Sequence, residues 1–175
     1  MKKRVLVLVA DYPRPDGSVA LMYVHVRNLF YMKHNIEVTV LNFASKEDYI
    51  IDNISVITLK TYEKNNLSYD IAISHAANIR NHYVFLKKYQ QKFPKLIFFF
   101  HGHEVLRINK EYPRPFKFTK KKSVIRRSFQ DIYDTVKFLM WRKFYQKLTY
   151  KSEFIFVSKW LYKKFLHYLK INDRE

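Results

Sequence analysis

Two histidines flank a glycine directly after a strongly apolar run, in the stretch KLIFFFHGHE at residues 95–104. The whole chain has only 2 glycines, and one of them, Gly102, stands here, where a buried strand is expected to end. Imidazole can transfer a proton near neutral pH or stabilise a charge that develops in a reaction, and a neighbouring carboxylate can orient the ring. His101 and Glu104 are therefore candidate catalytic residues. The alternative is an ordinary strand followed by a polar turn, which Glu104 caps.

Four further residues lie where expected strands or loops end. Gly17 and Ser18 follow two prolines in the loop DYPRPDGS. His75 ends the run DIAISH, and Ser158 follows the run EFIFV. Each residue also has a structural interpretation: Gly17 can form a plain turn and His75 can be a buried structural histidine. Ser18 and Ser158 can be helix N-caps, and Ser18 is expected to cap a helix that ends near Lys33.

Apolar runs typical of strands alternate along the chain with helical patterns. Strands are expected at residues 4–10, 36–43, 54–59, 70–75, 95–100 and 153–158. Helices are expected at residues 18–33, 76–92 and 159–170. Strands that alternate with helices through short connections favour a parallel sheet covered on both faces. The predicted fold class is therefore α/β, with a Rossmann-like parallel sheet, and its ligands should bind at the carboxyl ends of the strands.

Composition excludes several classes of protein. A chain of 175 residues suits a single domain with a substantial core. It contains no cysteine, which excludes disulfide frameworks and thiolate metal sites, and no metal-ligand spacing is apparent. The basic start resembles a signal peptide, but its apolar run ends at Asp11 after only a few residues. No apolar run approaches the ~20 residues of a membrane-spanning helix.

The formal net charge is +18, and most of the excess lies in one part of the chain. Residues 107–151 carry 14 basic and 3 acidic side chains. Such a block indicates an anionic partner, either lipid head groups or nucleic acid. The alternative is a general enrichment in lysine that reflects genome composition.

The same segment, an insertion at about 107–151, reads as a basic loop followed by a helix from Ser123. The apolar stripe expected to pack on the sheet is Ile125, Phe129, Ile132, Val136 and Leu139 or Met140. The expected membrane-surface residues are Lys120, Lys121, Lys122, Arg126, Arg127, Trp141, Arg142 and Lys143. Basic residues beside exposed aromatic rings suit the interface of an anionic membrane. A solvated helix face with ordinary core aromatics, or nucleic-acid binding through the same charges, are the alternatives.

Five segments together resemble the N-terminal halves of family 4 retaining glycosyltransferases of the GT-B type. They are KRVLVLVADYPRPDGS, HVRNLFYMKHNIEVTVLNF, YDIAISHA, LIFFFHGHEV and SEFIFVSKWLYKKF, in that order over nearly the whole chain. Two departures stand out. The first loop of the family often has paired glycines where this chain has Gly17 followed by Ser18, and the family often has Asp where this chain has Glu104.

The resemblance implies one Rossmann-like domain over 1–175 that binds the acceptor, a glycan or a lipid-linked envelope precursor. It implies transfer from a nucleotide-sugar donor with retention, without a cofactor or metal. His101 would face the donor sugar, Gly102 would allow close approach, and Gly17 would lie near the donor phosphates. His75 and Ser158 match a strand-end histidine and a serine at the edge of the cleft.

No segment resembles the donor-binding half, so a C-terminal domain is expected to be absent and the 175 residues to be inactive alone. The resemblance also implies a cytoplasmic protein at the inner face of the membrane. The alternative function is a basic module for nucleic acid or membrane on a Rossmann-like scaffold.

Overall fold

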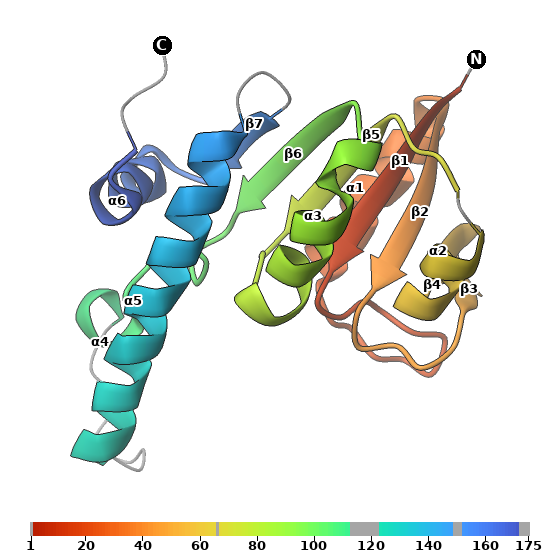
Figure 1. The fold of residues 1–175 in the computed structure, drawn as a ribbon. Coiled ribbons are helices and arrows are strands. Elements are labelled where there is room, and N and C mark those ends of the chain that lie inside the picture. Colours follow the sequence, from red (N-terminus) through yellow and green to blue (C-terminus); the bar gives the residue numbers. More distant parts are fainter. Residues whose placement is uncertain (1, 66, 113–122, 149–151, 172–175) are drawn as a thin grey trace.

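The fold is a seven-stranded open sheet flanked by helices (Figure 1). The structure is a computed structural model that describes residues 2–65, 67–112, 123–148 and 152–171. The strands are β1 (Lys3–Val9), β2 (Ile36–Asn42), β3 (Tyr49–Ile51), β4 (Ile54–Ile57), β5 (Ile71–His75), β6 (Lys95–Phe100) and β7 (Ser152–Phe156). The α-helices are α1 (Met22–Lys33), α2 (Leu59–Asn65), α3 (Val84–Tyr89), α4 (Ile108–Glu111), α5 (Val124–Lys147) and α6 (Lys159–Leu169). A π-helical turn, η1 (Ile79–Tyr83), precedes α3, and a 3-10 turn, η2 (Gln90–Lys92), follows it.

The strand order is β3-β4-β2-β1-β5-β6-β7, and every neighbouring pair is parallel except β3 with β4. From β1 the chain first extends the sheet on one side through β2 and β4, and then crosses to β5 on the other side. Open parallel sheets bind ligands outside the carboxyl ends of their strands, at such a switch in direction. The predicted α/β fold with a Rossmann-like parallel sheet is confirmed.

Alternate residues of the strands divide the core into two layers, as the pleat of a strand requires. In β1, Val5, Val7 and Val9 pack with Val24 of α1. Leu6 and Leu8 point to the opposite face of the sheet. Side chains of α2, α3, α5 and α6 join that second layer. Figure 1 accordingly shows α1 behind the sheet, with α2 and α3 in front of it.

The first helix begins later than the sequence predicts. Ser18 does not cap it: α1 starts at Met22, and its N-cap residue Leu21 has a φ of 53° and makes no side-chain capping bond. The predicted end is confirmed, since α1 stops at Lys33 and Asn35 has a φ of 63°. The strand β3 and the helix α2 are additional elements. The helix predicted at 76–92 starts only at Ile79 and consists of η1, α3 and η2.

The helix α5 faces the sheet with the side opposite to the predicted one. The predicted core stripe is exposed: the exposed fractions are 68% for Ile125, 67% for Phe129 and 60% for Ile132. Val136 and Leu139 are also exposed. The buried side consists of Asp134, Lys137, Phe138, Trp141, Phe144 and Tyr145.

Trp141 was predicted on a membrane surface, and this prediction is wrong. Its side chain is only 1% exposed, and its ring stacks on Tyr145 at a centroid distance of 5.0 Å. Arg126, Arg127, Arg142 and Lys143 are at least partly exposed on α5. Lys120, Lys121 and Lys122 lie outside the described residues.

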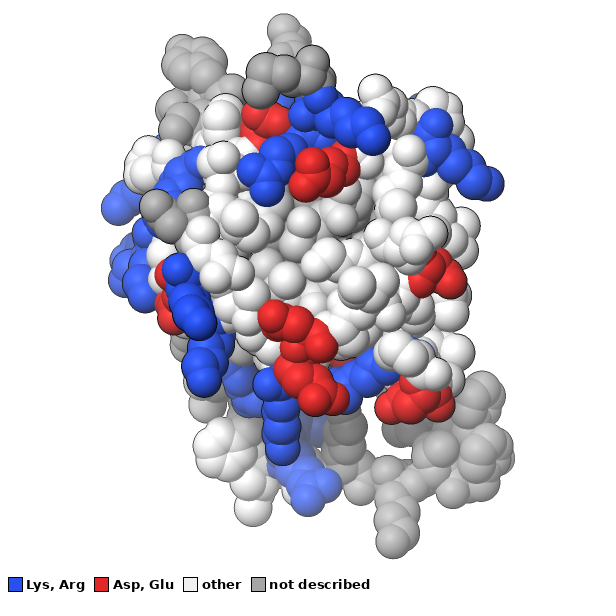
Figure 2. Space-filling model, turned by 90° about the vertical axis from the view of Figure 1, so that its right-hand side faces the viewer, with Lys and Arg blue, Asp and Glu red and all other residues white. Residues whose placement is uncertain are grey.

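The face near β4 and α2, on the right in Figure 1, carries acidic and basic side chains around an uncharged centre (Figure 2). The segment with the basic excess contributes α4 and α5, at the opposite end of the sheet. No helix in the described part of the chain is both long enough and apolar enough to cross a membrane.

Candidate functional site

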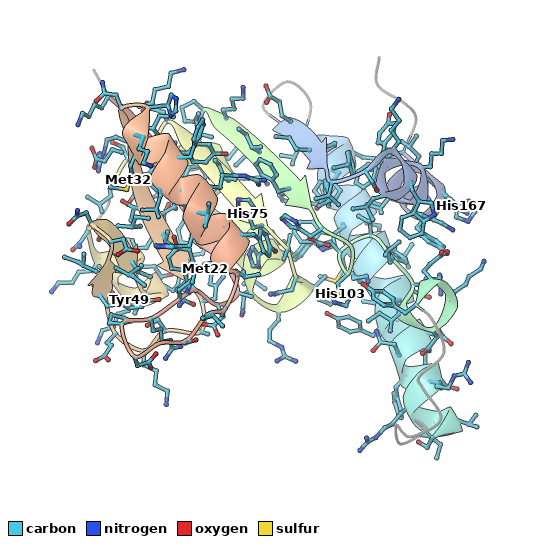
Figure 3. All side chains as sticks on the ribbon, turned by 180° about the vertical axis from the view of Figure 1, so that it is seen from behind. Met22, Met32, Tyr49, His75, His103 and His167 are labelled. Atoms are coloured by element: carbon cyan, nitrogen blue, oxygen red, sulfur yellow. The ribbon has the colours of Figure 1, made fainter. Side chains whose placement is uncertain are left out.

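His101 directly follows β6, and β6 lies between β5 and β7 with parallel pairing on both sides. The imidazole therefore lies at the carboxyl edge of the sheet, as predicted. Its Nε2 atom is 3.2 Å from Nδ1 of His75, which ends the neighbouring strand β5. Its ring is 4.7 Å, between centroids, from the ring of Tyr23 in the first turn of α1. The edge thus joins the ends of two strands to the start of α1 (Figure 3, where Met22 and His75 are labelled).

The turn after β6 is fixed by Glu104. Its buried carboxylate accepts hydrogen bonds from the backbone N–H groups of His101, at 3.0 Å, and Gly102, at 2.7 Å. This confirms the capping role and leaves the carboxylate directed at the backbone. Gly102 has a φ of 153°, and a Cβ atom there would lie 3.4 Å from the hydroxyl oxygen of Tyr112. The backbone conformation favours glycine here, while the space beside it would be only tight for a Cβ atom.

The segment after this turn is fastened to the inner face of α5. The Lys137 ammonium donates to the carbonyl oxygens of His103, at 2.8 Å, and Leu106, at 3.1 Å. It also pairs with Asp134 at 2.9 Å, and the Asp134 carboxylate accepts from the backbone N–H of Ile108. Burial lowers the pKa of Lys137, and the Asp134 carboxylate opposes that effect. A buried ion pair whose charges are fully hydrogen-bonded holds the turn in one place.

A cavity of about 270 Å³ opens beside this turn. Its lining residues are His101, Gly102, Leu106, Glu111, Tyr112, Val157, Ser158, Trp160 and Leu161. Three predicted site residues, His101, Gly102 and Ser158, therefore meet although they are far apart in the sequence. Ser158 also caps α6, because its hydroxyl accepts from the N–H of Leu161 at 3.1 Å.

Three polar or aromatic residues of the cavity were not predicted: Glu111, Tyr112 and Trp160. Glu111 pairs with Lys164 at 2.8 Å and accepts from the hydroxyl of Tyr168. The hydrogen bond from Lys164 is the main cause of its lowered pKa, so the carboxylate stays charged. Trp160 is 51% exposed at the rim. Nothing in the local sequence marks these three residues as part of a cavity.

His103 lies on the side of the turn toward α4 and α5 (Figure 3). Its Nδ1 atom is 3.0 Å from the hydroxyl of Tyr112, and the two rings stack with centroids 5.1 Å apart. His103 therefore supports the wall that Tyr112 contributes to the cavity.

The two histidines at the edge are kept uncharged. Burial lowers the pKa of His75 well below its ordinary value, and the neighbouring His101 and Arg27 lower it further. Burial also lowers the pKa of His101; the Glu104 charge opposes this and the Arg27 charge adds to it. A neutral imidazole can accept or donate one hydrogen bond at the cavity, which suits a role toward a sugar hydroxyl or a polar reaction centre.

The remaining predicted residues lie in the first loop or behind His101. Gly17 has a φ of 93° and donates its N–H to the carbonyl of Arg14, and this hydrogen bond closes a turn in the first loop. Ser18 donates its N–H to Asp16 in the same turn. Neither residue lines the cavity. His75 is fully buried and reaches the site only through its contact with His101.

The first loop is anchored by Tyr12, whose buried hydroxyl lies 2.9 Å from Nδ1 of His25 and accepts a hydrogen bond from Asn28. His25 in turn contacts Asp52 at 2.9 Å. This network ties the loop to α1 and to the turn between β3 and β4, and so sets where α1 presents Tyr23 to the site.

Among the described residues, no group of three His, Cys, Asp or Glu side chains is placed to hold a metal ion. A second cavity of about 320 Å³ lies between β7 and α6. Its lining is mainly aromatic and aliphatic core, including Phe154, Phe156 and Phe165, and brings none of the candidate residues together.

The chain matches no protein-family model and no curated protein. The functional proposal therefore depends on the geometry of this edge and on the motifs in the sequence.

Proposed function

We propose that the chain is the acceptor-binding half of a retaining glycosyltransferase that uses a nucleotide-sugar donor. The supporting observation is the cavity at the carboxyl edge of the sheet, around which His101, Gly102 and Ser158 meet. The same three residues stand at the positions that the resemblance to family 4 enzymes assigns to the cleft.

The chemistry of the cavity suits a sugar. Trp160 offers an exposed aromatic face, on which the apolar side of a pyranose ring can pack. Ser158, Tyr112 and the charged Glu111 surround it with hydroxyl and carboxylate groups that can bind sugar hydroxyls. The neutral His101 would lie against the reaction centre and stabilise charge that develops there. Neither a metal nor a cofactor has a role in this proposal.

In the same proposal the donor nucleotide is bound by a second α/β domain outside these 175 residues. Reaction would then take place between the two domains, because transfer requires both substrates in one orientation. The acceptor is a glycan or a lipid-linked precursor.

The outer face of α5 supports a membrane-bound location for this enzyme, at the cytoplasmic leaflet. This outer face consists of Val124, Ile125, Phe129, Ile132, Tyr133, Val136 and Leu139, all of them exposed. Arg126, Arg127, Arg142, Lys143 and Lys147 flank it, and none of them forms an ion pair with another described residue. An apolar stripe between unpaired cations fits the interface of an anionic bilayer.

Other occupants fit the outer face less well. A second copy of the chain would bring the same cations together, and their repulsion would oppose pairing. Nucleic acid would use the cations but leave the apolar stripe in water. Binding to nucleic acid through a basic scaffold is the alternative function.

Occupation of the cavity can be followed by tryptophan fluorescence, because Trp160 is exposed while Trp141 is buried. Methyl glycosides of glucose, galactose, mannose and N-acetylglucosamine are the probes. We expect a saturable change in emission for at least one of them, with millimolar affinity, and its loss in Trp160→Phe. If every glycoside leaves the emission unchanged, or if Trp160→Phe keeps the response, the cavity is not a sugar site.

A further inference from the structure

One cation at the same edge has no counter-charge. Arg27 lies on α1, one turn after Tyr23, and its guanidinium rests on the ring of Phe99 at 4.2 Å from the centroid. Its Nη1 atom is buried and has no hydrogen-bond partner, and no acidic side chain of the described residues forms an ion pair with Arg27. A buried N–H donor of a charged group costs free energy when it has no acceptor. A ligand that offers an acceptor oxygen to this group would remove that cost and bind more tightly.

The side chains around Arg27 leave its charge uncompensated. His75 stacks on the same Phe99 ring, and both His75 and His101 are kept neutral. Glu104 is the acidic residue nearest in the turn, but its two oxygens accept the N–H groups of His101 and Gly102. Burial raises the pKa values of Tyr23 and Tyr31, on which the Arg27 charge also acts, so both hydroxyls stay protonated.

Donors from α1 and from the turn after β6 lie near one another at the edge of the sheet, since the Arg27 charge acts on both Tyr23 and His101. Arg27 supplies a planar fork of N–H groups and Tyr23, which is partly exposed, a phenolic hydroxyl. His101 supplies an imidazole that contacts the Tyr23 ring and lines the cavity. An anion with several acceptor oxygens in a tetrahedral arrangement matches donors that come from different directions, and arginine is the residue that best binds such groups.

We propose that Arg27, Tyr23 and His101 form a binding site for the phosphate of a phosphorylated ligand. The inference rests on the proposed function only for the source of this phosphate, which is either the diphosphate of the sugar donor or the phosphate of a lipid-linked acceptor. The site would hold that phosphate beside the cavity that takes the sugar.

The test is an NMR titration of the 175-residue chain with inorganic pyrophosphate, at an ionic strength kept constant with sodium chloride. The imidazole signals of His101 and the side-chain N–H of Arg27 are the reporters. We expect saturable shifts with a dissociation constant of about 1–10 mM, and at least about tenfold weaker binding in Arg27→Gln, because the fork is lost. Tyr23→Phe should weaken binding by a smaller factor.

Arg126→Gln, an exposed arginine on α5, is the matched control and should bind as the unmodified chain does. Shifts that never saturate, or equal binding by Arg27→Gln and the unmodified chain, would overturn the phosphate site.

Two further titrations separate the sources. If uridine diphosphate binds about tenfold more tightly than pyrophosphate, the site belongs to the donor. If geranyl phosphate binds about tenfold more tightly than pyrophosphate, the site belongs to the acceptor. If pyrophosphate binds through Arg27 and neither of them binds more tightly, the phosphate site stands and this chain adds no contact to the nucleoside or to the lipid.

Discussion

Replacement of Trp141 by alanine is expected to lower the free energy of unfolding by about 3–5 kcal/mol, which is the usual cost of removing a fully buried aromatic side chain. The ring stacks on Tyr145 and makes an edge contact with Tyr83 at 5.4 Å, so its loss would leave a cavity between α5 and η1. Denaturant unfolding followed by circular dichroism measures the change.

Phe129→Ala is the matched control on the same helix. Phe129 is 67% exposed, and a surface substitution of this kind should change the unfolding free energy by no more than about 0.5 kcal/mol. If instead Phe129→Ala is the costly change and Trp141→Ala is tolerated, α5 faces the sheet with the side that the sequence pattern suggested, and the outer face described here is wrong.

The second large effect concerns membrane binding. The chain should sediment with liposomes that contain an anionic lipid, and the double variant Ile125→Ser/Phe129→Ser should bind at least about tenfold more weakly. Each of these side chains would bury apolar area in the bilayer that is worth roughly 1.5–3 kcal/mol when buried completely. Binding should also fall steeply by about 0.5 M salt, because charges are then screened within a few ångströms.

Ile50→Ser provides the control, since Ile50 on β3 has the same exposed fraction as Ile125, 68%, and lies away from α5. Its binding should be unchanged. Equal binding to neutral liposomes, or none to either kind, would contradict a membrane role for the outer face. A concentration-dependent dimer that Ile125→Ser/Phe129→Ser abolishes would assign the face to a second copy of the chain.

Six of the seven strands could be predicted from largely apolar stretches of the sequence, whereas the three-residue strand β3 could not. The apolar run that ends at Phe100 predicts the strand β6. It also predicts the position of His101, since a polar turn directly after a buried parallel strand lies at the carboxyl edge of the sheet. The meeting of His101 with Ser158 followed from the parallel pairing of β6 and β7, which alternating strands and helices predict but a single run does not.

The orientation of α5 could not be predicted, because two of its faces are apolar. Ile125, Phe129 and Ile132 recur at helical spacing, and so do Phe138, Trp141 and Tyr145 on another side. The buried face also contains Asp134 and Lys137, and a pattern of charges normally indicates solvent. Only the backbone groups of the turn after β6, which this ion pair binds, explain why two charges lie inside.

Ser18 was misassigned for a different reason. A serine before a helical pattern is a frequent N-cap, but α1 starts a turn later, after a residue in the left-handed conformation. The roles of Glu111, Tyr112 and Trp160 depend on contacts between α4, α6 and the turn after β6, which are distant in sequence and have no local signature.

The central claim is that these residues form the acceptor side of a sugar-transfer enzyme, and a transfer assay tests it most directly. Labelled nucleotide sugars and a lipid extract are incubated either with the 175-residue chain or with a longer protein in which the proposed donor-binding domain is joined to it. The account predicts no transfer by the 175 residues and transfer by the longer protein. It also predicts that His101→Ala, in a longer protein shown to be folded, lowers kcat about 100-fold and changes the donor KM much less. Transfer by the 175-residue chain alone, or an unchanged kcat in folded His101→Ala, would contradict it.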